Sequence, residues 1–450
     1  MKCLFIYPTL NVWSGHSEGI CILSALLKQA GHNVKLLHIN ENFFPFDEER
    51  IKEYIRDYYQ PGAILFSVVS NQYWAARIIA RSIRTYSPVP LIIGGIHATS
   101  RPEECLEDFD IVCRGEGEGA VVELVNALEE MNIAGIKNLW LRQGDKIIRN
   151  SLRPFIDLSS LPPGDRTVFD YQRVLDIRAG WLDIMAGRGC PRACSYCYNR
   201  NYAKLYQQDE HSGFVRIRRS EDIIAEIGDL RSQYSGINTV SFYDDSLTIN
   251  AGWLESFCSQ YRREVKLPFS CAAFPLELTD DTVRLLKNAG CLMVRIGVET
   301  ASEDTRHLIL NRPVSNRQIS DAIERVKSAG IKVTSYSMIG IPSETKDDVL
   351  ETLRFNAELG VNQVRLATLC PYQGTPIYDL CIEQGLLDPA STDRLPGYTT
   401  DTILNYPQEF KDFLSDVQAK PEDYLNMFCQ GKGYKYQHKY APSFAEKYYD

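Results

Sequence analysis

The chain has 450 residues, of which 44% are hydrophobic and 24% are charged, and its formal net charge is −9. This length exceeds a single hydrophobic core and indicates two or three domains. The negative charge, which no basic run offsets, argues against a nucleic acid or an anionic membrane surface as the main partner.

Residues 1–150 alternate short buried strands with amphipathic helices. Helical patterns cover GICILSALLKQAG (19–31) and WAARIIARSIRTY (74–86), and DIVCRGEGEG (110–119) resembles a strand that runs into a helix. The other strand-like segments are KCLFIYP (2–8), NVKLLHI (33–39), AILFSVVS (63–70) and PLIIGGIHAT (90–99). This rhythm predicts an α/β domain with a doubly wound parallel sheet, flavodoxin-like or Rossmann-like, whose ligands lie at the carboxyl ends of the strands.

Residues 151–180 contain Pro154, Pro162 and Pro163 without a sustained period, which indicates a linker. From 181 to about 375 the alternation of strands and helices restarts. Its strand-like segments are 181–187, 239–246, 268–275, 292–300, 332–342 and 362–371, and Asp244, Asp245, Glu299 and Glu344 fall at their ends. Six such units predict a partial (β/α)6 barrel with its chemistry at the carboxyl ends. Residues 376–450 are expected to form a short helical C-terminal part.

Three of the 13 cysteines are clustered, in GRGCPRACSYCYN (187–199), and the other ten stand singly in apolar patterns typical of small core residues. A structural zinc site requires four ligands, and neither cysteine nor histidine follows within ten residues of Cys197. A redox pair would use Cys194 and Cys197 and leave Cys190 without a role. A [4Fe-4S] cluster accepts three thiolates and can leave one iron open, and Gly187 and Gly189 would let the backbone approach it closely. Spacing favours the cluster without excluding the pair.

The cysteine pattern, its tyrosine and its place after the first barrel strand resemble the radical S-adenosylmethionine (SAM) superfamily. The resemblance implies that Cys190, Cys194 and Cys197 hold a [4Fe-4S] cluster whose open iron is chelated by SAM. An electron, delivered by a donor such as flavodoxin or ferredoxin, then cleaves SAM to a 5′-deoxyadenosyl radical. The resemblance also implies SAM contacts from Tyr196, Asp244, Asp245, Glu299 and the backbone around Gly340. Helix capping or salt bridges at the barrel end are the alternative for the acids, Glu344 included.

The segment RGEGEG (114–119) does not have the spacing GxGxxG, and the chain has no GxxxxGK[ST] loop, so a bound nucleotide is not expected. The first domain instead resembles the cobalamin-binding domain found ahead of radical SAM barrels. The resemblance implies that the cobalamin tail passes the small residues Ser67, Ser70, Gly94 and Gly95.

The segment SGHSEG (14–19) has the histidine and glycine spacing of free-standing cobalamin domains. His16 is therefore a candidate for the lower axial ligand of cobalt, with Ser14 in the place of the orienting carboxylate. A solvent-exposed loop histidine is the alternative.

Together these resemblances imply a cobalamin-dependent radical SAM methyltransferase that acts on an unactivated carbon (or phosphorus) centre through methylcobalamin and a 5′-deoxyadenosyl radical. A cyclase, a ring-rearranging enzyme or an oxidative enzyme with the same cofactors is the alternative. A cobalamin sensor without turnover would have a degenerate barrel, and a methylthiotransferase would have further coupled cysteines and a terminal binding module.

The expected substrate is a small molecule or a lipid-like compound, and the protein is expected to be a monomer. No apolar run approaches the roughly 20 residues that span a bilayer, and Pro8 ends the first apolar stretch too early for a signal peptide. We therefore expect a cytoplasmic protein. The tail GKGYKYQHKYAPSF (431–444) is either a lid or a strap against the barrel, and a strap is favoured.

Overall fold

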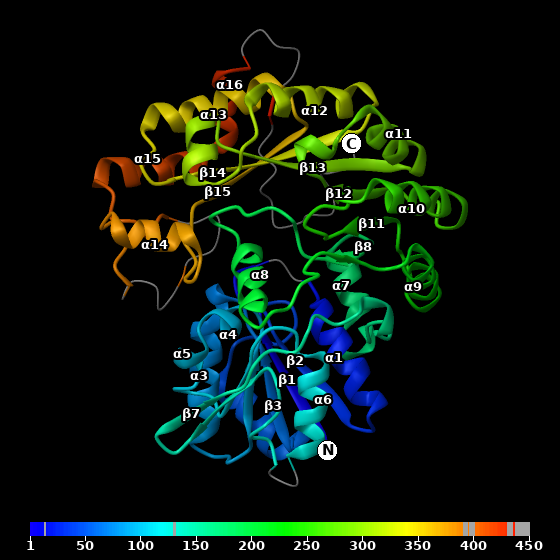
Figure 1. Ribbon diagram of the computed structural model, residues 1–450, viewed down its shortest axis with the longest axis vertical. Helices are drawn as coiled ribbons and strands as arrows, with labels where there is room; N and C mark the ends of the chain where they lie inside the picture. Colours follow the sequence, from blue (N-terminus) through cyan, green and yellow to red (C-terminus); the bar gives the residue numbers. More distant parts are fainter. Residues whose placement is uncertain (13–14, 129–131, 390–394, 396–400, 430–434, 437–450) are drawn as a thin grey trace.

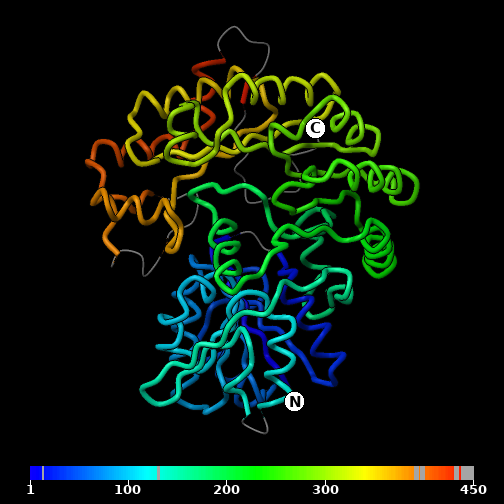
Figure 2. Tube along the Cα trace, in the orientation of Figure 1, coloured from blue at the N-terminus to red at the C-terminus, as the bar shows by residue number. Residues whose placement is uncertain are grey.

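Two sheets organise the chain in the computed structural model, which describes residues 1–12, 15–128, 132–389, 395, 401–429 and 435–436. Figure 1 shows the N-terminal sheet domain in blue and cyan and a half-barrel in green and yellow beside it. Figure 2 follows the chain as it passes from the first body into the second. No helix in these ranges is long and apolar enough to cross a membrane.

The first sheet has the order β2-β1-β3-β4-β5-β6-β7. Strands β1 to β5 are parallel, which confirms the predicted doubly wound sheet in its flavodoxin-like order. The antiparallel strands β6 and β7 form a hairpin that the sequence did not predict. The seven strands are β1 (Lys2–Pro8), β2 (Asn33–Ile39), β3 (Ala63–Ser67), β4 (Leu91–Gly94), β5 (Ile111–Cys113), β6 (Leu139–Gln143) and β7 (Lys146–Arg149).

Side chains on the first sheet alternate between two cores because successive residues of a strand point to opposite faces. Leu4 and Ile6 pack with the core on the α3 side, whereas Cys3 and Phe5 belong to the core on the α1 and α6 side, which continues into the barrel. Figure 1 shows α3 and α6 on opposite faces of the sheet. The helices are α1 (Glu18–Gln29), α2 (Glu48–Glu53), α3 (Tyr73–Arg84), α4 (Ile96–Ser100), α5 (Pro102–Cys105) and α6 (Glu118–Ala127).

The segment predicted to be a linker is packed between the two bodies and contains a short helix, α7 (Tyr171–Ile177). Arg166 in this segment is 2% exposed and pairs with Glu18 of α1 at 2.7 Å and with Glu226 of the second body at 3.2 Å. A buried arginine with two carboxylate partners is fixed in place, since losing either partner leaves a charge unpaired. This segment therefore acts as an interdomain core.

The second sheet has the order β15-β14-β13-β12-β11-β8, and its strands are all parallel. All six predicted strands are present, and the sheet is an open partial barrel. The strands are β8 (Trp181–Ile184), β11 (Thr239–Phe242), β12 (Phe269–Ala272), β13 (Cys291–Glu299), β14 (Lys332–Ile339) and β15 (Gln363–Thr368). The helices of this part are α8 (Tyr198–Gln208), α9 (Ser220–Gln233), α10 (Ala251–Glu264), α11 (Asp280–Ala289), α12 (Asn316–Ser328) and α13 (Lys346–Leu359).

A short antiparallel ribbon, β9 (Gly187–Arg188) and β10 (Arg216–Ile217), lies beside the barrel. The described C-terminal part is helical, as predicted, with α14 (Pro376–Glu383), α15 (Gln408–Ala419) and α16 (Pro421–Met427). The tail at 431–444 lies outside the described residues apart from Lys435 and Tyr436. The Tyr436 hydroxyl donates to the carbonyl of Asn356 on α13.

Candidate active site between the two domains

The three clustered cysteines lie between β9 and the first turn of α8 and line one cavity of about 390 Å³. Both neighbouring glycines are required by the fold. Gly189 has a φ of +88°, and a Cβ there would lie 2.5 Å from the Phe214 carbonyl oxygen. A Cβ on Gly187 would lie 2.5 Å from the Arg216 carbonyl oxygen. The glycines thus let β9 approach β10, which is a different reason from the one that the sequence suggested.

The cysteine trio lines the cavity at three points, as the thiolates of a [4Fe-4S] cluster would. Within the described ranges, no three Cys, His, Asp or Glu side chains form a group that could hold one metal ion. In a [4Fe-4S] cluster each thiolate binds a different iron, so three thiols have to surround a volume. Arg312 Nη1 lies 4.0 Å from the Cys194 Sγ and places a positive charge beside the cysteine trio.

Four of the five residues predicted to bind SAM line the same cavity, namely Tyr196, Asp244, Asp245 and Glu299. Gly340 does not line it. Its N–H donates to Glu344 at 2.6 Å, and its carbonyl accepts from the Tyr406 hydroxyl at 3.3 Å. Any contact of Gly340 with SAM therefore stays a prediction.

Glu299 is the meeting point of the cavity's polar groups. The Tyr196 hydroxyl donates to Glu299 Oε1 at 2.8 Å, and Arg312 Nε lies 3.7 Å from the same oxygen. Glu299 has a φ of +66° at the end of β13, where the pairing with β14 shifts register. A non-glycine residue in this region is strained, and such strain gathers at functional sites.

The two aspartates after β11 have different partners. Asp244 accepts hydrogen bonds from the backbone N–H groups of Ala186 (3.0 Å) and Gly187 (2.6 Å), so it fixes the start of the cysteine loop. Burial raises the pKa of Asp244 to about 6. Asp245 accepts from the Asn199 side chain at 2.9 Å, and burial raises its pKa as well. Asp244 thus binds the backbone ahead of the cysteine loop and caps no helix, and SAM contacts from either aspartate stay a prediction.

A second cavity, which we call the B12 slot after the cofactor that the sequence predicts for this domain, measures about 380 Å³ and opens at the carboxyl ends of the first sheet. Ser67, Gly94 and Gly95 line it, as predicted, together with apolar side chains such as Phe5 and Leu65. Gly95 has a φ of +97°, and a Cβ there would lie 2.6 Å from the Val68 carbonyl oxygen. An apolar slot walled by small residues between the strands suits a long, partly apolar cofactor tail.

Ser70 and His16 lie outside the B12 slot. Ser70 Oγ is hydrogen-bonded to the Tyr198 hydroxyl at 2.7 Å and to His97 Nδ1 at 3.2 Å, so it joins the first domain to α8. The His16 side chain is 5% exposed, which makes the alternative of a solvent-exposed histidine wrong. His16 lines a third cavity of about 350 Å³.

His16 has one feature of a ligand. Its Nε2 lies 3.4 Å from Glu18 Oε2, while its Nδ1 is buried and has no partner among the described residues. Burial lowers the pKa of His16 to about 4, so the ring is neutral at pH 7. Glu18 takes the orienting place that the sequence assigned to Ser14, which lies outside the described residues. Ligation of cobalt by His16 stays a prediction.

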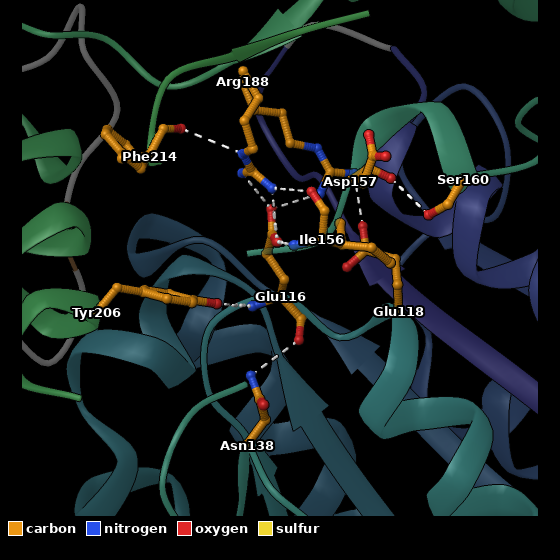
Figure 3. Close-up of polar contacts among 10 residues, drawn as sticks. Glu116, Glu118, Asn138, Ile156, Asp157, Ser160, Arg188, Tyr206 and Phe214 are labelled. Atoms are coloured by element: carbon orange, nitrogen blue, oxygen red, sulfur yellow. Dashed lines mark hydrogen bonds and ion pairs between the residues drawn. The ribbon is translucent and has the colours of Figure 1, made fainter. Parts of the chain in front are cut away.

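Two glutamates of RGEGEG lie in the wall of the B12 slot and bind arginines of the β9–β10 ribbon (Figure 3). Glu116 pairs with Arg188 at 2.9 Å and with Arg216 at 2.7 Å, and Glu118 pairs with Arg188 at 2.6 Å. The Glu116 N–H also donates to the Tyr206 hydroxyl at 2.8 Å. The spacing of RGEGEG argued only against a bound nucleotide and did not predict these ion pairs, because the arginines lie far along the chain.

The cavity lined by the three cysteines, which we call the cluster cavity, adjoins the B12 slot. Asn199, Tyr243, Asp244 and Asp245 line both of them. The sequence singled out the two aspartates but not Asn199 or Tyr243, because neither residue type signals a site at that spacing. The arrangement places the cysteine trio and the slot on either side of a shared wall.

Comparisons with known proteins agree with this two-part site. A model of the B12 binding domain matches residues 14–125, and a model of the Radical SAM superfamily matches residues 184–355. An uncharacterized methyltransferase of Pyrococcus horikoshii is 25% identical over 450 residues, which cover 96% of this chain and 93% of that protein. An anaerobic magnesium-protoporphyrin IX monomethyl ester cyclase of Cereibacter sphaeroides is 24% identical over 405 residues, or 84% of this chain and 63% of the cyclase.

The fold matches that of a solved enzyme. The radical SAM methyltransferase TsrM from Kitasatospora setae superposes with a TM-score of 0.70 at 18% identity, over 85% of this chain and 76% of TsrM. The chain is therefore a radical SAM enzyme that carries a B12 binding domain ahead of its barrel, and its cofactors are a [4Fe-4S] cluster, SAM and cobalamin.

Proposed function

We propose that this enzyme is a methyltransferase that acts on an unactivated carbon (or phosphorus) centre of a small molecule or lipid-like compound. The observation that carries the proposal is the wall shared by the cluster cavity and the B12 slot. When bound, the cluster and SAM supply a radical that opens an unreactive bond, and cobalamin supplies a methyl group. A substrate at the shared wall would be within reach of both.

In this proposal each group of residues has a separate task. Cys190, Cys194 and Cys197 hold the cluster. SAM binds beside the cluster and contacts Tyr196, Asp245 and Glu299, together with the backbone of Gly340. Asp244 holds the backbone ahead of the cysteine loop in place. Ser67, Gly94 and Gly95 leave room for the cobalamin tail, with Ser70 and His16 at the edge of that site.

The buried ion pairs of Glu116 and Glu118 hold the two domains together and keep water out of the space between them. A dry, fixed site protects a reactive intermediate and orients the reacting groups. Residues 1–150, 151–180, 181–375 and 376–450 would then be the cobalamin domain, the connecting segment, the barrel and the C-terminal extension of a monomer. We expect a flavodoxin or ferredoxin to deliver the electron.

The test is a turnover mixture that contains the reconstituted enzyme, a reductant, SAM with a labelled methyl group and a filtered metabolite extract. Methyl transfer releases both 5′-deoxyadenosine and S-adenosylhomocysteine and leaves the label in a new product. Cyclisation or ring rearrangement releases 5′-deoxyadenosine without S-adenosylhomocysteine. That second pattern would overturn the methyltransferase proposal in favour of a reaction like that of the cyclase relative.

A further inference from the structure

Tyr243 lies where the cavities of the molecule meet. It directly follows β11 and is 49% exposed, which is unusual for a large hydrophobic residue. It lines the cluster cavity, the B12 slot and the cavity beside His16. It also lines a fourth cavity of about 110 Å³ inside the half-barrel. A half-exposed aromatic ring at the end of a barrel strand is not needed for the hydrophobic core, so it is available to a ligand.

The fourth cavity, which we call the barrel pocket, is lined by positive charge. Arg178, Arg295 and Arg365 line it, and no aspartate or glutamate is among its described lining residues. The charge of Arg178 is balanced by an ion pair with Asp183 at 2.8 Å. Arg295 also lines the cluster cavity, so it faces the region where the reaction would occur.

Arg295 has neutral partners where its neighbours have charged ones. It donates to Ser241 Oγ at 3.1 Å and to the carbonyl of Phe242, and no carboxylate of the described residues lies within ion-pair distance of it. In the cluster cavity, by contrast, Arg192 pairs with Glu277 and Arg312 pairs with Glu299. Neutral acceptors orient a guanidinium without cancelling its charge. The nearby buried carboxylate of Asp183 also feels the charge of Arg295, but its ion pair is with Arg178.

The ring of Tyr243 completes the arrangement. The Arg295 guanidinium lies 5.3 Å from the centre of this ring, and the Arg178 guanidinium lies 5.5 Å from it and donates to its hydroxyl. These contacts hold the ring in one orientation between the barrel pocket and the shared wall of the two cofactor sites.

We propose that Arg295 binds an anionic group of the substrate, a carboxylate or a phosphate, while the body of the substrate lies against Tyr243. This inference rests on the proposed function and adds the chemical class of the substrate to it. A guanidinium binds either anion through two parallel hydrogen bonds, which fix the direction of the bound molecule. The rest of the substrate then extends from the barrel pocket to the wall between the cluster cavity and the B12 slot.

The test measures binding of simple probes to the full-length holoenzyme saturated with SAM, by titration calorimetry. Benzoate and phenyl phosphate carry the two anions on one ring, and benzyl alcohol carries the ring without a charge. We expect R295Q to bind benzoate or phenyl phosphate at least about tenfold more weakly than the unmodified enzyme. Benzyl alcohol should bind R295Q and the unmodified enzyme alike, whereas Y243A should weaken binding of all three probes.

Two further variants serve as controls. R317Q removes an arginine that is 90% exposed on α12, and it should bind every probe as the unmodified enzyme does. R295K keeps the charge and loses the planar fork, so its affinity for the anionic probes should lie between those of the unmodified enzyme and R295Q. The tighter of the two anionic probes identifies the anion as carboxylate or phosphate.

Several results would overturn the inference. The anionic probes would fail to bind the unmodified enzyme, or R295Q would bind them with unchanged affinity. Loss of SAM binding by R295Q, with the probes unaffected, would instead assign the arginine to the cofactor. Calorimetry does not depend on methyl transfer, so a mixture that yields no S-adenosylhomocysteine would refute the proposed function and leave the anion site standing.

Discussion

Glu116 of the first domain and Arg216 of the second are joined across the domain boundary by two hydrogen bonds, of 2.7 and 3.0 Å. The same carboxylate accepts from Arg188 and from the N–H of Ile156. Burial alone would raise the pKa of Glu116, but the Arg216 hydrogen bonds and the charge of Arg188 hold it below its ordinary value. The carboxylate therefore stays ionised and keeps two arginines paired.

Replacing Glu116 by alanine should lower the free energy of unfolding by about 3 kcal/mol, since the largely buried Arg216 would lose its carboxylate partner and Arg188 would keep Glu118 alone. The variant should also retain less cobalamin, because Glu116, Arg188 and Arg216 all line the B12 slot. Urea unfolding and the corrin absorbance of the purified protein measure the two effects. Glu123→Ala, which removes an exposed pair with Arg153, should cost less than about 1 kcal/mol. Equal losses in the two variants would show that the interdomain pairing is not important.

Replacing Cys194 by alanine should remove a ligand of the cluster and abolish reductive cleavage of SAM. Iron content after anaerobic reconstitution and the yield of 5′-deoxyadenosine are the measurements. Cys258→Ala is the matched control, because Cys258 is equally buried but lies in α10, away from the cluster cavity. Normal cleavage by Cys194→Ala would refute the cluster assignment.

The two glycines at the end of β4, Gly94 within the strand and Gly95 directly after it, should respond differently to alanine. A Cβ on Gly94 would make ordinary contacts of 3.7 Å with Cys113, so Gly94→Ala should fold normally while narrowing the B12 slot. Gly95→Ala should lower the free energy of unfolding by about 1–3 kcal/mol, because its φ is left-handed and its Cβ would overlap the backbone of Val68. Thermal unfolding and hydroxocobalamin titration separate the two effects. Unchanged cobalamin affinity in Gly94→Ala would show that the cobalamin tail does not pass this glycine.

Glu344 should make stability depend on pH. Burial raises its pKa to about 8, from an unfolded value near 4.5. The protonated form thus favours the folded state, and this contribution is complete below about pH 4.5 and declines as the pH rises to 8. Glu344→Gln, whose amide oxygen can still accept from Gly340 and Ile341, should gain stability relative to the unmodified protein over this range, by up to about 1.4 kcal/mol per pH unit.

Denaturant unfolding at pH 5, 6.5 and 8 tests this dependence. Glu351→Gln removes a half-exposed carboxylate of α13 and should give a difference from the unmodified protein that does not change with pH. Parallel stability curves for Glu344→Gln and the unmodified protein would mean that Glu344 is ionised when buried.

The six barrel strands were predictable because each is a short apolar run that ends in polar residues, as in the segment before Asp244. The cysteine loop was predictable because its chemistry lies within one stretch of chain. Local patterns also explain why the β9–β10 ribbon was missed, since two-residue strands show no period. The hairpin of β6 and β7 was also missed. The turn between its strands is marked in the sequence only by Gly144, which is a weak signal for a hairpin.

Contacts between distant segments could not be read from the sequence. Glu116 meets Arg188 and Arg216 across 72 and 100 residues of chain, and no local pattern connects them. Arg166 looked like part of a proline-rich linker, yet two carboxylates from different domains enclose it. Tyr243 stood beside two aspartates of obvious interest, and its importance comes from its place among the cavities.

The B12 slot has one wall in each domain: Ser67 and Gly94 belong to the first, and Gly189 and Phe214 belong to the second. Neither domain by itself therefore forms the complete binding site that the slot provides. A cobalamin bound in the B12 slot would contact both domains, so it would be held most tightly after both halves have folded and met. A chimera that takes its first 150 residues from a relative would keep two sound folds but lose the cofactor, unless the facing ribbon were exchanged with them.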